Sequence, residues 1–435
     1  MSIALRSLLA LIFLTTISLN AFAQEERFYL PLDGGDELEI SRSGQGNEGP
    51  LFIWLVNQYG EMTTPSRVIQ HLTDLGAQVW RVDLLESLLL QRSSATIRRL
   101  DGEPVAALIE TAIASGTSGP IVVLACDRMA APLLRGLHHW QAYNPDNPIV
   151  AGGILLFPNL YRGTPIAGEE PELLGIVAAT NMPIVLFQPD MGSNRQRLLP
   201  LLTTLHEAGS PAYAWLVRDV RDYYILRSEV SRNRALSSMA GSMPEGVRQA
   251  IDATPRQLLA AARLLAQAPR PTQTLTVDQA TETPVAPAYG LVERSPRPAP
   301  DYDLIDARGQ RHTLDESLGR VTLVNFWATW CPPCVHEIPS MNRLASAYEE
   351  DEFAIVSINF RETPEHILDF MRQVEVDFPV LMDIDGAISA DWGVFAFPSS
   401  FILDRNGNIR YSVNTAIEWD IEAVREVIDD LRMEN

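Results

Sequence analysis

The 435-residue sequence predicts two α/β domains joined by a proline-rich segment. Short apolar runs alternate with helix-like stretches from about residue 51 to 217, and again from 321 to 433. Between these regions, 7 of the 32 residues from 269 to 300 are proline, which is typical of an extended linker and not of a packed core. The expected division is a first domain over residues 24–268, the linker over 269–300 and a second domain over 301–435.

Residues 1–23 have the features of a secretory signal peptide. Arg6 supplies the positive charge, residues 8–19 are largely apolar, and Ala21-Phe22-Ala23 has the small-x-small pattern of a cleavage site. The apolar stretch is about half of the roughly 20 residues that a membrane-spanning helix needs. We therefore expect cleavage, no stable membrane span afterwards, and export to the periplasm; a retained N-terminal anchor is the alternative.

Composition excludes several classes of function. The formal charge is −21 and all 34 basic residues are arginine, so lysine Schiff-base chemistry and a P-loop lysine are excluded. Nucleic-acid binding is not expected of such an acidic chain. Three cysteines are too few for a disulfide scaffold, and His336 is the only histidine close to the cysteine pair described below. We therefore expect no metal and no cofactor other than a redox-active disulfide.

The first domain is predicted to begin with a strand hairpin around Gly34-Gly35 and to continue as alternating strands and helices. Its strands are runs of apolar residues without polar alternation, which is typical of strands buried on both faces of a doubly wound sheet. The predicted strands are 27–33, 37–42, 51–56, 78–83, 121–125, 151–157, 183–188 and 212–217, and the predicted helices are 65–75, 104–114, 132–143, 173–179, 195–208 and 229–268.

This order of elements resembles the α/β-hydrolase fold over residues 27–265. The resemblance implies a nucleophile on a sharp turn after the fifth strand, then an acid and a histidine. Asp127 stands at the nucleophile position and Asp190 at the acid position. Within residues 27–265, no histidine follows the last predicted strand, and His206 lies in the helix before that strand. The resemblance therefore implies a degenerate hydrolase site. An active esterase or dehalogenase-like hydrolase with an accessory redox domain is the alternative. We expect Cys126 to be a buried thiol.

The second domain contains Trp330-Cys331-Pro332-Pro333-Cys334, between an apolar run at 321–327 and a helix-like run at 335–348. Two cysteines three residues apart on the first turn of a helix lie on one side of it, close enough to form a disulfide. The helix N-terminus stabilises negative charge and lowers the pKa of a thiol placed there. We therefore expect a reversible disulfide, in which Cys331 attacks and Cys334 resolves.

The remaining elements of the second domain follow from the same patterns. A hairpin is predicted at 302–305 and 311–314, and Asn406-Gly407 marks a turn between two later strands. The other predicted strands are 353–359, 378–382, 400–403 and 409–413, and the other predicted helices are 364–374, 387–392 and 419–433.

Two separated motifs, Asn325 to Cys334 and Phe397 to Asp404, resemble the TlpA/ResA family of exported thioredoxin-like thiol-disulfide oxidoreductases. The resemblance implies that Pro398 is a cis-proline whose preceding backbone pairs with a bound substrate, and that Phe397 shapes the choice of partner. The same surface includes Trp330, Pro332 and Pro333.

Glu337 matches an acidic residue of ResA-like members, and the resemblance implies that it raises the thiol pKa values and shuttles a proton. Asn325 stands where ordinary thioredoxins have a buried aspartate. We therefore expect Glu337 to take the role that the buried aspartate has in ordinary thioredoxins.

The expected function is reduction of disulfides in an exported protein client. A membrane thiol electron donor of the DsbD or CcdA type would recharge the dithiol, because an exported protein has no access to cytosolic reductant. The first domain would bind or dock the client. A disulfide oxidant or isomerase remains an alternative, since Pro332-Pro333 does not fix the reduction potential. A thiol peroxidase is a poor match, because it needs a single peroxidatic cysteine in a Thr-x-x-Cys setting, and Trp330-Cys331 does not fit that setting.

Overall fold

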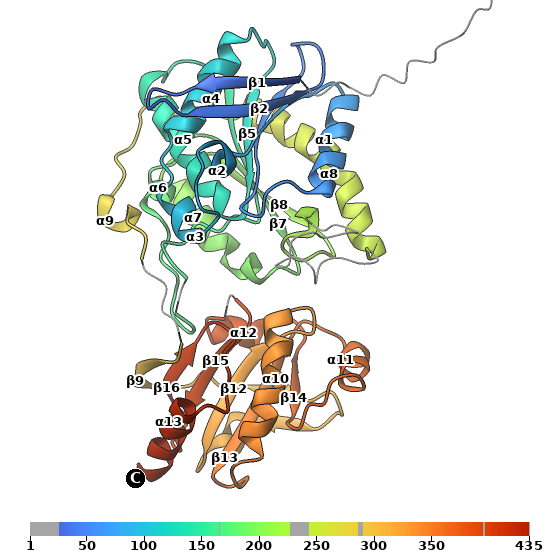
Figure 1. Cartoon of the computed structure of the whole chain (residues 1–435), viewed down its shortest axis with the longest axis vertical. Coiled ribbons are helices and arrows are strands. Elements are labelled where there is room, and N and C mark those ends of the chain that lie inside the picture. The colour runs from blue at the N-terminus through green and yellow to red at the C-terminus, as the bar shows by residue number, and fades with distance from the viewer. Residues whose placement is uncertain (1–25, 165, 227–242, 286–289, 395, 435) are drawn as a thin grey trace, which may run out of the picture.

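The computed structural model describes residues 26–164, 166–226, 243–285, 290–394 and 396–434. The chain forms two α/β domains, drawn from blue to yellow-green and from orange to red (Figure 1). The predicted signal peptide, 1–23, lies outside the described residues, as does the first part of the helix predicted at 229–268. Within the described ranges, no helix has both the length and the apolar character needed to cross a membrane.

The first domain contains an eight-stranded mixed sheet with the order β1-β2-β4-β3-β5-β6-β7-β8. The leading hairpin and its junction with β4 are antiparallel, and every later pair is parallel. All eight strands were predicted, the first two from the hairpin signal at Gly34-Gly35 and the other six from apolar runs. They are β1 Glu26–Pro31, β2 Glu37–Ser43, β3 Leu51–Leu55, β4 Gln78–Val82, β5 Ile121–Cys126, β6 Val150–Leu156, β7 Ile184–Pro189 and β8 Ala212–Val217.

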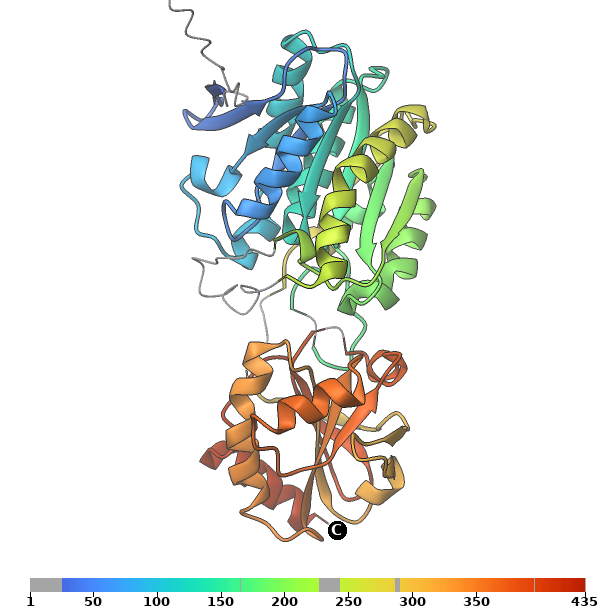
Figure 2. The same ribbon diagram turned by 90° about the vertical axis from the view of Figure 1, so that its right-hand side faces the viewer.

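Helices cover both faces of this sheet, which explains why strands such as β5 and β7 are buried along their whole length. One face packs on α1 (Thr63–Asp74) and α8 (Glu245–Gln267), which lie side by side in Figure 2. The other packs on α4 (Glu103–Ala114), α5 (Ala130–Tyr143) and α7 (Leu198–Glu207). Short helices not predicted from the sequence are α2 (Leu84–Ser87) and α3 (Ser94–Arg99); the predicted helix 173–179 shortens to α6 (Gly175–Ala178).

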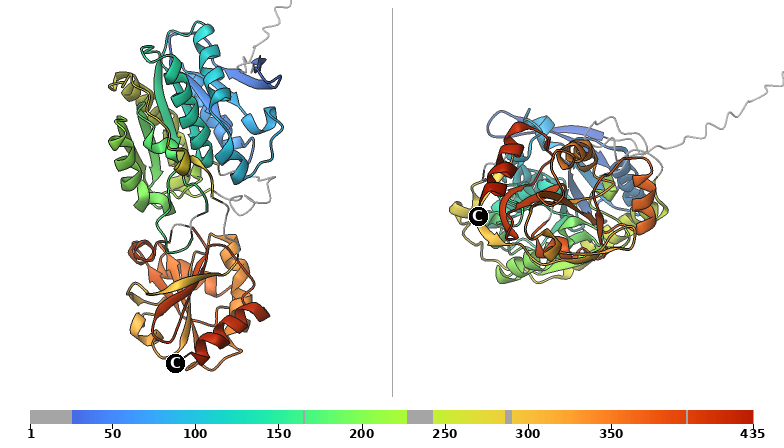
Figure 3. Two further views of the ribbon diagram at one scale, coloured as in Figure 1. Left: turned by 90° about the vertical axis from the view of Figure 1, so that its left-hand side faces the viewer. Right: turned by 90° about the horizontal axis from the view of Figure 1, so that it is seen from below.

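The second domain, called the redox domain below, has a six-stranded sheet with the order β14-β13-β12-β15-β16-β9 and a separate β10-β11 hairpin. Its C-terminal end lies far from the first domain (Figure 3). The strands are β9 Val292–Pro298, β10 Asp303–Ile305, β11 Arg311–Thr313, β12 Val321–Trp327, β13 Phe353–Phe360, β14 Val380–Asp383, β15 Ser399–Leu403 and β16 Asn408–Val413. The helices are α10 Pro332–Ala345, α11 Pro364–Met371, α12 Ala387–Asp391 and α13 Glu422–Met433.

Residues 269–285 and 290–300 of the proline-rich stretch contact the two domains, although its composition predicts an extended linker. Its first half lies along α5, where Gln141 Nε2 donates to Pro271 O at 2.8 Å and Arg135 pairs with Glu282 at 2.5 Å. The short helix α9 (Gln279–Glu282) belongs to this half, and β9 forms an edge strand of the redox domain. Proline is tolerated on an edge strand because it removes no ladder bond on the solvent side. Composition could not reveal these partners, because they lie in other elements.

A long loop between β6 and α6, residues 158–164 and 166–174, reaches from the first domain onto the redox domain (Figure 1). We call it the docking loop. Ala167 is 1% exposed and belongs to the same buried cluster as Phe326 and Phe401 of the redox domain. Arg297 of β9 donates to Gly168 O at 2.9 Å. These contacts hold the carboxyl ends of strands β5–β8 against the redox domain.

Candidate functional site

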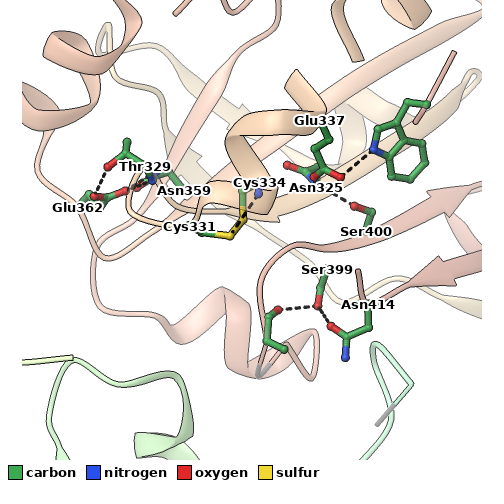
Figure 4. The surroundings of a disulfide bond; sticks show 12 residues. Asn325, Thr329, Cys331, Cys334, Glu337, Asn359, Glu362, Ser399, Ser400 and Asn414 are labelled. Carbon is green, nitrogen blue, oxygen red and sulfur yellow. Dashed lines mark hydrogen bonds between the residues drawn. A yellow bond between two sulfur atoms is a disulfide. The ribbon is translucent and has the colours of Figure 1, made fainter. Parts of the chain in front are cut away.

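Cys331 and Cys334 form a disulfide at the N-terminus of α10 (Figure 4). Cys331 is the N-cap residue, and its Sγ accepts a hydrogen bond from the Cys334 N–H at 3.3 Å. Pro332 begins the helix, where its missing N–H removes no intrahelical bond. Cys331 is 5% exposed and Cys334 1% exposed. The predicted arrangement is present, with Cys331 the more exposed of the two.

The segment before the disulfide is held by Glu362, which sequence reasoning missed. The Thr329 N–H and hydroxyl donate to the two Glu362 oxygens at 2.8 and 2.7 Å, and Asn359 Nδ2 donates to one of them at 2.9 Å. Glu362 is 7% exposed and follows β13. An acidic residue two positions after a buried strand was the available signal. Because Thr329 is two residues before Cys331, Glu362 sets the direction from which the chain enters the disulfide.

Glu362→Gln is expected to lower the free energy of unfolding of the oxidised protein by about 1–3 kcal/mol. The carboxylate accepts all three hydrogen bonds, whereas the glutamine NH₂ cannot accept one, so at least the Thr329 hydroxyl loses the oxygen to which it donates. Urea unfolding measures the loss, and Glu365→Gln, at an exposed position on α11, is the matched control. Equal unfolding midpoints for the two variants would contradict the assignment.

The loop before β15 contains a cis peptide bond between Phe397 and Pro398. β15 pairs antiparallel with β12, and Ser399 lies opposite Phe326. This register brings Pro398 to the end of β12 from which the disulfide segment leaves. The Phe397 ring contacts the Trp330 ring edge to face, with centroids 5.9 Å apart. The structure therefore places the two sequence motifs next to each other.

Glu337 is buried one helical turn after Cys334, and its carboxylate points toward Asn325 (Figure 4). Asn325 Nδ2 donates to its Oε1 at 2.8 Å, and Trp419 Nε1 donates to its Oε2 at 3.1 Å. Burial raises the pKa of Glu337 to about 7, although the hydrogen bonds from Trp419 and Asn325 oppose part of this shift. The carboxyl group therefore changes charge near neutral pH, within one turn of the disulfide.

In the first domain, Asp127 directly follows β5 and has a φ of 51°, a strained backbone conformation for a residue other than glycine. Its Oδ2 accepts hydrogen bonds from Gln58 Nε2 and Arg128 Nη1, each at 3.0 Å. Burial is the largest influence on its carboxyl group and raises its pKa. Neighbouring Cys126 is a free thiol, 2% exposed, and burial raises its pKa strongly. The expectation of a buried thiol at Cys126 agrees with this geometry.

Asp190 and His206 do not join Asp127 in one site. The Asp190 Oδ1 accepts from the Asp219 N–H at 2.9 Å, and no described hydrogen bond joins it to Asp127. His206 Nε2 lies 2.8 Å from Ala212 O, at the start of β8, whereas Asp127 lies at the end of a strand. The described residues therefore contain no nucleophile-histidine-acid arrangement around Asp127.

A cavity of about 340 Å³ lies between the two domains and reaches Cys331. The redox domain contributes an apolar wall that includes Trp330 and Phe397. The first domain contributes α3, part of the docking loop and the segments after β5, β7 and β8, which bring three arginines to the cavity: Arg98, Arg128 and Arg221. The Arg221 guanidinium lies over the Trp330 ring, 4.5 Å from its centroid. None of these arginines was singled out from the sequence.

Comparisons with known proteins match the redox domain. Residues 296–412 match the family model described as AhpC/TSA family. Over 115 residues, covering 26% of this chain, the sequence is 37% identical to the thioredoxin-like protein YneN of Bacillus subtilis (strain 168), of which it spans 66%, just under two thirds. Over 131 residues it is 33% identical to the thiol-disulfide oxidoreductase ResA of Geobacillus thermodenitrificans (strain NG80-2), covering 30% of this chain and 75% of the relative.

Among solved structures, a thiol:disulfide interchange protein of the thioredoxin family from Chlorobium tepidum TLS is 25% identical; the likeness covers 32% of this chain and 99% of that one, with a TM-score of 0.28. The matched family region contains the Cys331–Cys334 pair and the cis-proline loop. These likenesses assign no function to the first domain. Through its thioredoxin-like second domain, the chain belongs to the family of thiol-disulfide oxidoreductases that includes ResA.

Proposed function

We propose that the protein is a reductase of disulfides in exported, periplasmic proteins. The observation that carries this proposal is the Cys331–Cys334 disulfide at the start of α10, with the cis-proline loop beside it. In the reduced protein, the Cys331 thiolate attacks a client disulfide and releases one client thiol. Cys334 then attacks Cys331 Sγ, which releases the second thiol and re-forms the disulfide. The backbone before Pro398, with Phe397, Trp330, Pro332 and Pro333, contacts the client.

Glu337 has the properties of the base for the second step. The resolving thiol of Cys334 must lose a proton. A carboxyl group with a pKa of about 7 is about half ionised near neutral pH and can accept that proton. Asn325 and Trp419 hold this carboxylate in position in the oxidised protein. In this proposal Glu337 receives the proton within one turn of the helix, while Asn325 orients it.

Recharging the oxidised protein needs an electron donor outside the cytosol. We propose a membrane thiol donor of the DsbD or CcdA type, consistent with export directed by residues 1–23. The donor must approach the same Cys331 sulfur as the client, since Cys334 is 1% exposed. Donor and client therefore use one surface in turn.

For the first domain we propose an α/β-hydrolase-like fold that has lost hydrolysis and serves to bind the client. The strand order and the strained Asp127 after β5 support the fold. The pairing of Asp127 with Arg128, and the position of His206 against Ala212, argue against the alternative of an active esterase or dehalogenase-like enzyme. A buried, ion-paired carboxylate without a base beside it is poorly suited to complete a hydrolytic cycle.

Full-length Cys334→Ser is expected to accumulate mixed disulfides with periplasmic proteins, because Cys331 still attacks and nothing resolves the product. Non-reducing gels followed by mass spectrometry would identify the trapped partners. The matched control is the double variant Cys331→Ser/Cys334→Ser, which has no attacking thiol. Trapped species equally abundant in both variants would contradict the proposal.

The direction of the reaction follows from the reduction potential. We expect the Cys331–Cys334 couple to be reducing when it is equilibrated with glutathione buffers, and the fraction of free thiol can be measured by alkylation. A strongly oxidising couple would instead support the alternative of a disulfide oxidant or isomerase.

A further inference from the structure

The cavity beside Cys331 has a basic wall in a strongly acidic protein. The chain has a formal charge of −21, yet Arg98, Arg128 and Arg221 all line this cavity. They come from α3, from the turn after β5 and from the segment after β8. Three guanidinium groups from distant parts of the sequence meet opposite one disulfide. Their like charges repel, so the arrangement is costly unless negative charge is present.

Arg98 gives the clearest evidence that this cavity suits an anion. Its residue is 4% exposed, and its Nε donates to Tyr161 O at 2.9 Å. No acidic side chain of the described residues forms an ion pair with it. Burial, together with repulsion from Arg128, lowers the pKa of Arg98 to about 10, and Asp127 offsets part of this effect. A buried guanidinium without a carboxylate partner is rare, because desolvation of the charge is uncompensated.

Two carboxylates near the cavity do not cancel this charge. Asp127 is held by Arg128 at 3.0 Å. Asp222 accepts hydrogen bonds from the Ser193 N–H at 3.0 Å and from Gln188 Nε2 at 3.1 Å. Burial raises the pKa of Asp222 to about 6, so its negative charge is fully developed only well above that pH. Among the described residues, these two carboxylates leave Arg98 without an ion-pair partner, and the positive excess lies on its side.

Several residues with strained backbone conformations lie at the carboxyl ends of the strands of the first domain, on the side of the cavity. Asp127 after β5, Phe157 after β6, and Asp219 and Tyr223 after β8 have φ values of 51°, 40°, 58° and 64°. Non-glycine residues with positive φ are uncommon, and they concentrate where a fold builds a functional site. The carboxyl ends of parallel strands are also where open α/β sheets bind their ligands. The geometry is thus that of a ligand site facing the disulfide.

We propose that this cavity binds a carboxylate carried next to the reacting sulfur of the substrate, with Arg98, Arg128 and Arg221 as the anion-binding side chains. The inference rests on the proposed reductase function for its chemistry and on the cavity for its selectivity. Trp330 and Phe397 contact the apolar part of the substrate, and the guanidinium groups contact the carboxylate. A disulfide with acidic groups is therefore preferred over a neutral or basic one.

The redox step balances without another co-reactant. The reduced pair supplies two electrons and two protons, and a substrate disulfide R–S–S–R accepts them to give two R–SH. One sulfur–sulfur bond breaks in the substrate and one forms between Cys331 and Cys334. Two kinds of molecule carry the required chemistry: a low-molecular-weight disulfide with carboxylates, and an acidic segment that flanks a cystine in a client protein.

Binding to the oxidised full-length protein tests the inference apart from turnover, because the oxidised pair has no attacking thiol. The probes are 3,3′-dithiodipropionate, its uncharged diamide, which has the same number of non-hydrogen atoms, and the smaller cationic disulfide cystamine. Isothermal titration calorimetry is expected to show the dianion binding at least about tenfold more tightly than the diamide, with cystamine weakest. Equal affinities for the dianion and the diamide would overturn the proposal.

Arginine variants test whether the cavity arginines cause the preference for the dianion over the diamide. Arg98→Gln is expected to remove the preference and Arg98→Lys to retain part of it. Because Arg98 is buried, Arg221→Gln, at a half-buried position, provides a second variant that should also weaken the preference. Arg27→Gln, in an exposed ion pair with Glu39, is the matched control and should bind as wild type. A preference unchanged in both cavity variants, with native circular dichroism, would overturn the assignment.

Turnover by the reduced protein distinguishes a small-molecule disulfide from an acidic segment of a client protein. It also tests the reductase function separately from the anion site. Peptide disulfides flanked by glutamate are compared with glutamine-flanked ones, beside the small probes. Faster reduction of the glutamate peptide indicates an acidic client segment, and a preference confined to dithiodipropionate indicates a small molecule; both support the site. Charge-selective binding without any turnover would contradict the reductase function but support the anion site. Turnover without charge preference would support the reductase function but contradict the anion site.

Discussion

Full-length protein carrying Cys331→Ser is expected to lose catalysed disulfide reduction, with a fall in rate on the order of a thousandfold or more. The hydroxyl of serine is not ionised near neutral pH, so no nucleophile remains where the substrate sulfur approaches. Cys334 cannot replace it, because it is 1% exposed and lies behind Cys331 on the first turn of α10. Insulin reduction monitored by turbidity measures the loss.

Cys126→Ala is the matched control, since it also removes one thiol from the chain. Cys126 is 2% exposed at the end of β5, and burial raises its pKa, so it has little thiolate at neutral pH. Wild-type activity is expected for this variant. Substantial activity in Cys331→Ser, or loss of activity in Cys126→Ala with its fold intact, would contradict the assignment of Cys331 as the attacking thiol.

Glu337→Gln is expected to abolish a fall of about 3 kcal/mol in the stability of the oxidised protein, which wild type shows as the pH rises from 4.5 to 8. The carboxyl group titrates near its ordinary value of 4.5 in the unfolded chain and at about 7 in the folded protein. Between these values the folded state binds more protons than the unfolded state, so wild-type stability falls as pH rises through this window. Glutamine cannot ionise, and this fall disappears.

Urea unfolding between pH 4.5 and pH 8 measures the effect as a difference between variant and wild type, which cancels the titration of every other group. Glu349→Gln, an exposed position near the end of α10, is the control and should follow the wild-type curve. Parallel curves for wild type and Glu337→Gln across the whole range would show that the Glu337 carboxyl group is not perturbed by burial.

Local sequence patterns were sufficient to predict those parts of the fold and the site whose residues are close in sequence. The disulfide depends on two cysteines three residues apart at a helix start, and the Gly34-Gly35 turn together with six apolar runs predicted the eight strands of the first sheet. Asn325 stands at the position of an acid in ordinary thioredoxins, and in the structure it donates to Glu337, the residue expected to take over the acid's task. These features arise within one element or between neighbouring elements.

The cavity could not be predicted in the same way, because its charged wall is assembled from distant segments. Arg98 and Arg221 each stand in a polar stretch that has no motif, and only the parallel sheet brings them to one edge. The packed stretch 269–285 was missed for a related reason. Its backbone carbonyls accept hydrogen bonds from Gln141 and His138 of α5, and no property of the stretch itself encodes those donors.

The docking loop has a consequence for folding. Ala167 fills a place in the interior of the redox domain, and Gly393 approaches Gly168 so closely that a Cβ atom on Gly393 would lie 3.1 Å from the Gly168 Cα. The two domains therefore share buried surface and are expected to unfold as one cooperative unit. A redox domain produced alone would present an unfilled apolar depression beside Trp392 and Phe401, and such surfaces promote aggregation.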